Sequence, residues 1–191
     1  LMLIKTEDLP LSPESAVTKL DNKLNKQPVI ENKSNVKKSA EEELLEKKAE
    51  LNIIFAAAPS QNDVLLSLIN DKTIEWNRIN AFHMDEYVGL SKTAPQGFGN
   101  FLKEHIFSLV PFKSVNYLDC EASDVLAECQ RYSTLLKNNP TDIVIMGIGE
   151  NGHIAFNDPP VADFNDNAMV KKVKLDEICR QQQVNDGCFG D

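Results

Sequence analysis

Short apolar runs separated by polar, helix-like segments recur along most of this chain. Three of the runs are Leu51–Phe55, Ile79–Met84 and Ile143–Met146, and Val115–Leu118 is a further, weaker one. The first three are short and rich in β-branched or aromatic residues, as is typical of buried strands in a parallel sheet. The pattern therefore predicts strands at these four places.

Amphipathic helical segments alternate with the runs. They are predicted over 39–50, from a Ser60/Asp63 capping box onward, after Gly97–Gly99 through Phe107, and from Ser123 or Asp124 to about Leu136. Strands that alternate with helices are typical of the α/β class. We therefore expect a parallel sheet with helices on both faces.

The beginning of the chain lacks this regularity. Lys, Asn, Ser and Pro dominate residues 1–36, and the apolar residues follow no clear period. We expect 1–36 to be weakly structured and 37–191 to form a single domain. The chain starts without Met and ends at Asp191, and we expect the domain to be incomplete at its C-terminus.

Composition narrows the function classes. The net charge of -9 and the absence of a basic block argue against binding of nucleic acid or of an anionic membrane. No apolar run is long enough to span a membrane, and the four cysteines show no C-x-x-C spacing. We predict a cytoplasmic protein with no metal site, and the sequence leaves a homo-oligomer open.

The segment that follows Ile143–Met146 carries the strongest chemical signal. It reads GIGENGHIAFNDP from Gly147 to Pro159. In α/β sheets, ligands bind beyond the carboxyl ends of the strands. Glycines there allow sharp turns, and Gly152 lets a substrate approach His153. His153 with Asp158 predicts a general acid/base held by a carboxylate, against the alternative of a structural histidine in a polar loop.

Two other strand ends carry polar groups. Asp85 and Glu86 follow Ile79–Met84, and one of them would face a pocket as a base, unless both belong to a solvated turn. Ser60 and Gln61 open the helix after Leu51–Phe55, where free N–H groups bind anions. An ordinary strand–helix connection explains this second feature equally well.

Two motifs resemble those of a known family. MDEYVGL (Met84–Leu90) and GIGENGHIAFNDP, in this order, are similar to the signatures of the glucosamine-6-phosphate deaminases, whose superfamily includes the 6-phosphogluconolactonases. The resemblance covers about residues 51–189. It implies a Rossmann-like fold and conversion of glucosamine 6-phosphate and water to fructose 6-phosphate and ammonia, without a metal or organic cofactor.

The resemblance also implies roles for individual residues. Asp85 would move the proton between C2 and C1, His153 would open the sugar ring, and Asp158 would support His153 where the family usually has Glu. Asn151 stands where the family has Asp or Asn. The expected substrate-binding residues are Ser60, Gln61, Glu86, Gly149, Gly152 and Arg180.

The chain departs from the family pattern in its phosphate-binding region. An Ala56–Pro59 turn replaces the usual Gly/Ser/Thr-rich turn, and Arg180 does not clearly match the phosphate-binding Arg. The expected partner is a small sugar phosphate. A 6-phosphogluconolactonase-like hydrolase and a non-catalytic sugar-binding descendant remain as alternatives to the deaminase.

Overall fold

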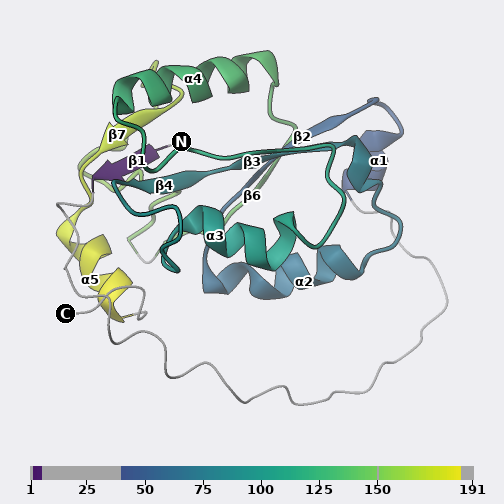
Figure 1. Ribbon diagram of the computed structural model, residues 1–191, viewed down its shortest axis with the longest axis horizontal. Helices are drawn as coiled ribbons and strands as arrows, with labels where there is room; N and C mark the ends of the chain where they lie inside the picture. Colours follow the sequence, from purple (N-terminus) through teal and green to yellow (C-terminus); the bar gives the residue numbers. More distant parts are fainter. Residues whose placement is uncertain (1, 6–39, 150, 186–191) are drawn as a thin grey trace.

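The strands form two parallel sheets (Figure 1), and the computed structural model describes residues 2–5, 40–149 and 151–185. The four-stranded sheet has the order β5 (Ser114–Asn116), β3 (Ile79–His83), β2 (Leu51–Phe55) and β6 (Ile143–Ile145). The three-stranded sheet has the order β4 (Asp85–Val88), β1 (Met2–Lys5) and β7 (Lys171–Val173). The predicted Rossmann-like α/β class with a parallel sheet is confirmed.

Helices follow most of the strands. They are α1 (Ala40–Leu45), α2 (Asn62–Asn70), α3 (Phe98–Leu102), which continues as the π-helical segment η4 (Lys103–Phe107), α4 (Val125–Asn138) and α5 (Glu177–Asn185). Short 3-10 turns cover η2 (Pro59–Gln61) and η3 (Trp76–Arg78). Within the described ranges, no helix is long and apolar enough to cross a membrane.

Alternate residues of the central strand β2 face the two layers of helices. Ile53 and Phe55 belong to the core that also contains Leu65 of α2 and Leu102 of α3. Ile54 packs instead in the cluster that contains residues of α4. Figure 1 shows the result, with α4 on one side of the four-stranded sheet and α2 and α3 on the other. The period of two along β2 thus places helices on both faces.

Local sequence signals identified some helix boundaries and missed others. Asp124 is the N-cap of α4, and its carboxylate accepts hydrogen bonds from two backbone N–H groups, as predicted. The predicted Ser60/Asp63 capping box is wrong, because Ser60 lies inside η2 and Gln61 occupies the N-cap position of α2 without a side-chain cap. Pro59, which fixes its own φ, starts a 3-10 turn before the helix. The helix predicted over 39–50 ends early, at Leu45.

Two predicted strands behave differently from expectation. The run Ile79–Met84 gives β3, and a new strand, β4, begins immediately at Asp85 and joins the other sheet. Ile143–Ile145 is the edge strand β6 among the described strands, so the prediction of a buried strand is wrong: the side chain of Val144 is 43% exposed. Only β2 pairs with β6 in the described part of the chain, which leaves its outer side uncovered.

The N-terminal strand joins the second sheet together. β1 lies between β4 and β7, with Met2 opposite both Asp85 and Lys171. It falls within the segment 1–36 that was expected to be weakly structured, of which residue 1 and residues 6–36 lie outside the described residues. Asp85 therefore begins a central part of the architecture rather than a surface turn.

Candidate active site

The segment after β6 folds into tight turns that place its polar groups. Gly152 has φ +86°, which favours glycine, and Ala155 has φ 53°. The amide of Gly149 donates to the carbonyl of His153 at 2.9 Å, and the amide of Gly152 donates to the carbonyl of Gly149 at 2.9 Å. These turns bring Asn151, His153 and Asp158 together.

His153 is held by two partners on one side of its ring. Its Nδ1 lies 2.6 Å from Oδ1 of Asn151 and 3.3 Å from Oδ1 of Asp158. Nδ2 of Asn151 donates to Oδ1 of Asp158 at 3.0 Å, which orients the Asn151 amide with its oxygen toward His153. The backbone amide of His153 also donates to Oδ1 of Asn151, at 3.1 Å. Nδ1 therefore carries the proton, and Nε2 is left as the acceptor for chemistry.

Asp158 is the anchor of this group. Its side chain is only 1% exposed, and its Oδ2 accepts from the backbone amide of Asp176 at 3.4 Å. Its carbonyl accepts hydrogen bonds from the amides of Val161 and Ala162, both at 2.9 Å. The shorter Asp side chain thus reaches both Asn151 and His153 from a buried position.

Gly149 packs against the imidazole of His153. A Cβ placed on Gly149 would lie 2.1 Å from Cε1 and 2.4 Å from Nε2 of that ring. Real Cβ atoms essentially never come so close to another heavy atom. Gly149 is therefore needed for the position of the ring, which gives a physical reason for a glycine that the sequence marked only as a substrate-binding candidate.

The turn after β2 lies next to the start of the same loop. The amide of Ala56 donates to the carbonyl of Ile145 at 2.9 Å. A Cβ on Gly147 would lie 3.2 Å from Nε2 of Gln61 and 3.9 Å from Oγ of Ser60. The structure thus brings Ser60 and Gln61 to the loop that carries His153, as expected of parallel strands that end at one edge.

Asp85 is a buried carboxyl at the junction of the two sheets. Its residue is 6% exposed, and burial, followed by the nearby charge of Glu86, raises the pKa of Asp85 to about 7. A carboxyl whose pKa is raised toward neutral pH can both take and return a proton. It suits the base that the sequence assigned to it.

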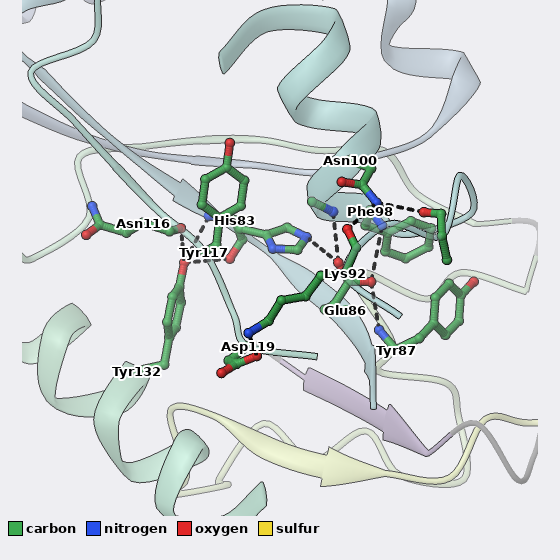
Figure 2. A network of polar contacts seen from close by, with 12 residues as sticks. His83, Glu86, Tyr87, Lys92, Phe98, Asn100, Asn116, Tyr117, Asp119 and Tyr132 are labelled. Atoms are coloured by element: carbon green, nitrogen blue, oxygen red, sulfur yellow. Dashed lines mark hydrogen bonds and ion pairs between the residues drawn. The ribbon is translucent and has the colours of Figure 1, made fainter. Parts of the chain in front are cut away.

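Glu86 faces a different neighbour. Its carboxylate accepts from the backbone amides of Tyr87 at 2.9 Å, Phe98 at 3.1 Å and Gly99 at 2.8 Å, so that it caps the start of α3 (Figure 2). Burial raises the pKa of Glu86, while these three hydrogen bonds oppose the rise. Of the two adjacent carboxyls, Glu86 already has backbone donors, and this leaves Asp85 as the better base.

Three aromatic rings connect the two sequence motifs. The ring of Phe156 lies 5.6 Å from that of Tyr87 and 5.6 Å from that of Phe98, centroid to centroid. Each motif contains one aromatic residue, and this was a signal from which the contact could have been predicted. The contact fixes the His153 loop against the strand that begins at Asp85.

Arg180, like Asp85 and Glu86, makes no hydrogen bond or ion pair to Asn151, His153 or Asp158 in the described part of the chain. It lies on α5, and its Nε is buried without a hydrogen-bond partner among the described residues. Its backbone amide donates to Asp176, whose own amide contacts Asp158. Nor do the described ranges contain a group of three or more His, Cys, Asp or Glu side chains able to hold a metal ion.

Known proteins are similar to this chain in sequence and in fold. The family described as glucosamine-6-phosphate isomerases/6-phosphogluconolactonase matches residues 24–171. The chain belongs to this family.

Several glucosamine-6-phosphate deaminases are similar to this chain in sequence. A glucosamine-6-phosphate deaminase of Lactobacillus delbrueckii subsp. bulgaricus is 43% identical over 86 residues, covering 45% of this chain and 37% of that protein. A glucosamine-6-phosphate deaminase of Streptococcus sanguinis is 36% identical over 131 residues, covering 68% of this chain and 56% of that protein. The chain thus spans about half, or less, of the length of these relatives.

Solved structures of the same family show the same fold. A monomeric glucosamine-6-phosphate deaminase superposes with a TM-score of 0.64 at 28% identity, covering 75% of this chain and 60% of that one. A 6-phosphogluconolactonase from Thermotoga maritima superposes with a TM-score of 0.54 at 28% identity, covering 60% of this chain and 53% of that one.

Proposed function

We propose that this chain acts as an amino-sugar phosphate isomerase and deaminase, converting glucosamine 6-phosphate and water to fructose 6-phosphate and ammonia. The observation that carries the proposal is the pair of groups with separate tasks. His153 is oriented by Asn151 and Asp158 through Nδ1, and Asp85 is a buried carboxyl with a pKa of about 7. Ring opening and carbon proton transfer require two such groups.

His153 performs the first step of the proposed reaction. Its Nε2 takes the proton of the C1 hydroxyl and returns a proton to the ring oxygen, which opens the sugar to the aldehyde. Asp158 and Asn151 keep the Nδ1 proton in place, so that the ring stays in the tautomer with a free Nε2. The imidazolium formed in passing is stabilised by the Asp158 carboxylate.

Asp85 performs the proton transfer between carbon atoms. Its carboxylate removes the C2 proton while the C1 carbonyl oxygen takes up a proton from solvent, which gives an enolamine. The same carboxyl then delivers its proton to C1 while the amino nitrogen releases a proton to solvent, which leaves an imine at C2. Water adds to this imine, ammonia leaves, and the ketose phosphate remains. The partial burial of Asp85 raises its basicity toward the value that such a transfer needs.

The two alternatives make different demands on the same residues. A 6-phosphogluconolactonase-like hydrolase needs His153 to activate water but needs no carbon base, and the lactonase likeness of the fold supports it. A non-catalytic sugar-binding descendant needs neither.

A small sugar phosphate is the proposed partner in each case, and a cytoplasmic location and a homo-oligomer remain part of the proposal.

The experiment is to incubate the chain separately with glucosamine 6-phosphate and with 6-phosphogluconolactone, and to measure release of ammonia and of acid. The deaminase proposal expects ammonia from the first sugar. Acid release from the second sugar alone supports the lactonase, and no turnover with measurable binding supports the descendant.

A second measurement isolates the role of Asp85. In deuterated water, the wild-type chain should exchange the C2 proton of glucosamine 6-phosphate, and Asp85→Asn should stop the exchange while sugar binding persists. Exchange at the wild-type rate in this variant would assign the base to another group, with Glu86 as the next candidate.

A further inference from the structure

A cavity lies outside the loop that carries His153. Its volume is about 390 Å³, within the range of small-molecule sites. It is lined by Glu86, Ser91, Lys92, Gly97, Gly99, Asn100, Lys103, Tyr117, Leu118, Asp119 and Cys120. Glu86 alone belongs also to the predicted active-site residues, so this cavity is a separate feature of the fold.

The walls of this cavity expose mostly apolar atoms. Gly97 and Gly99 leave backbone without side chains along one wall. On the other side, the ring of Tyr117 is positioned by aromatic contacts. It packs edge-on against His83, with centroids 6.2 Å apart, and against Phe107, at 5.6 Å. A half-exposed aromatic ring in a fixed position beside bare backbone provides a surface suited to a flat molecule.

The buried polar groups at the base of the cavity offer no attraction to an anion. Glu86 already accepts backbone hydrogen bonds from Phe98 and Gly99, so the start of α3 is occupied. His83 lies behind this wall, with Nε2 3.7 Å from Oε2 of Glu86. It is fully buried and burial lowers the pKa of His83 to about 3, so that it is neutral.

The cations lie nearer the solvent. Lys92 pairs with Asp119, with Nζ 3.0 Å from Oδ1, as Figure 2 shows. Lys103 is exposed and has no ion pair within the described ranges. Of the two lysines that line the cavity, Lys103 is therefore the one without an ion-pair partner among the described residues, and the anionic group of a ligand would be attracted to it.

We propose that this cavity binds a small, flat organic anion, whose ring lies against Tyr117 and the Gly97–Gly99 backbone and whose carboxylate pairs with Lys103. The ligand enters ring first, because the inner wall contains the Glu86 carboxylate and a neutral His83. This site shares Glu86 with the residues considered for the deaminase chemistry but uses neither His153 nor Asp85.

The probe for the test is benzoate, titrated into the full chain while backbone amide resonances are followed by NMR. Shifts should concentrate at Gly97, Gly99 and Tyr117. Benzyl alcohol, which has the same ring without the charge, should bind at least about tenfold more weakly. Shifts centred on Gly149 and Gly152, or equal affinity for the two probes, would overturn the proposal.

Lysine variants provide a second test of the benzoate site. Lys103→Ala should weaken benzoate binding about tenfold or more, whereas Lys137→Ala, which removes an exposed lysine of α4, should leave it unchanged. Saturating glucosamine 6-phosphate should not displace benzoate. Displacement would place the probe in the active site, and an unaltered affinity of Lys103→Ala would remove the basis of the site, whether or not the chain deaminates the sugar.

Discussion

Gly149 lies against the imidazole of His153 so closely that a methyl group has no room: the added Cβ would be 2.1 Å from Cε1 of the ring. Nδ1 of the same ring is 2.6 Å from Asn151, so the ring is confined by contact as well as by hydrogen bonding. The orientation of the proposed acid/base group therefore depends on a residue that has no functional group of its own.

We expect Gly149→Ala to lower kcat by at least about a hundredfold, because the ring must move by an ångström or more to admit the methyl group. Thermal unfolding should show that the fold is retained. Gly147→Ala is the matched comparison, since its Cβ would lie 3.2 Å from the flexible end of Gln61 and at an ordinary 3.9 Å from Oγ of Ser60. A larger loss in Gly147→Ala than in Gly149→Ala would contradict this account.

His153→Gln should lower turnover of glucosamine 6-phosphate by about two to four orders of magnitude, the usual share of general acid/base catalysis. The Gln side chain keeps polarity and similar size but removes the group that can take up and return a proton. Steady-state kinetics with wild-type and variant chains measures the effect. An unchanged kcat would exclude His153 as the acid/base group.

The pH dependence of activity should report Asp85. Its pKa of about 7 predicts that kcat/KM falls as the pH drops below about 7, because the base becomes protonated. Stability should respond in the opposite direction. The folded pKa lies above the ordinary value of 3.8, so this group's contribution is complete below about pH 4 and is lost as pH rises through 7. Asp85→Asn should thus gain stability relative to wild type between pH 4 and pH 8 in urea titrations.

His83 should make the wild-type chain sensitive to mild acid. Neither of its ring nitrogens has a hydrogen-bond partner among the residues that the structure describes, and burial lowers its pKa from 6.5 to about 3. Its contribution to stability is present above pH 6.5 and is lost as pH falls toward 3. Relative to wild type, His83→Leu should gain about 2 kcal/mol between pH 7 and pH 5 in the free energy of unfolding. Equal differences at the two pH values would count against a buried neutral histidine.

Phosphate should contribute little to substrate choice. Ala56–Pro59 leads into η2, and the nearby donors are Ser60 and Gln61, opposite Gly147. Alanine restricts positive φ and the close approach of N–H groups to an oxyanion. We expect glucosamine 6-phosphate to be preferred over glucosamine by less than about 3 kcal/mol, measured as the ratio of kcat/KM values. A ratio well beyond about a hundredfold would reveal a complete phosphate site.

Local patterns determined the order of strands and helices and the chemistry of the loop after β6. The apolar run Leu51–Phe55 and the Asp124 N-cap act over a few residues, and both are found where they were predicted. Likewise, the glycines and the spacing of His153 and Asp158 encode a turn and a pairing that neighbouring residues can satisfy by themselves.

Tertiary structure decided what depends on segments far apart in the chain. β4 enters a second sheet because Met2–Lys5 pairs with it, across residues that carry no local sign of that pairing. Glu86 caps α3 because the chain returns to it at Gly99, and Gln61 faces Gly147 because β2 and β6 are neighbours. Residue periodicity records which face of an element is buried, but not which distant element covers it.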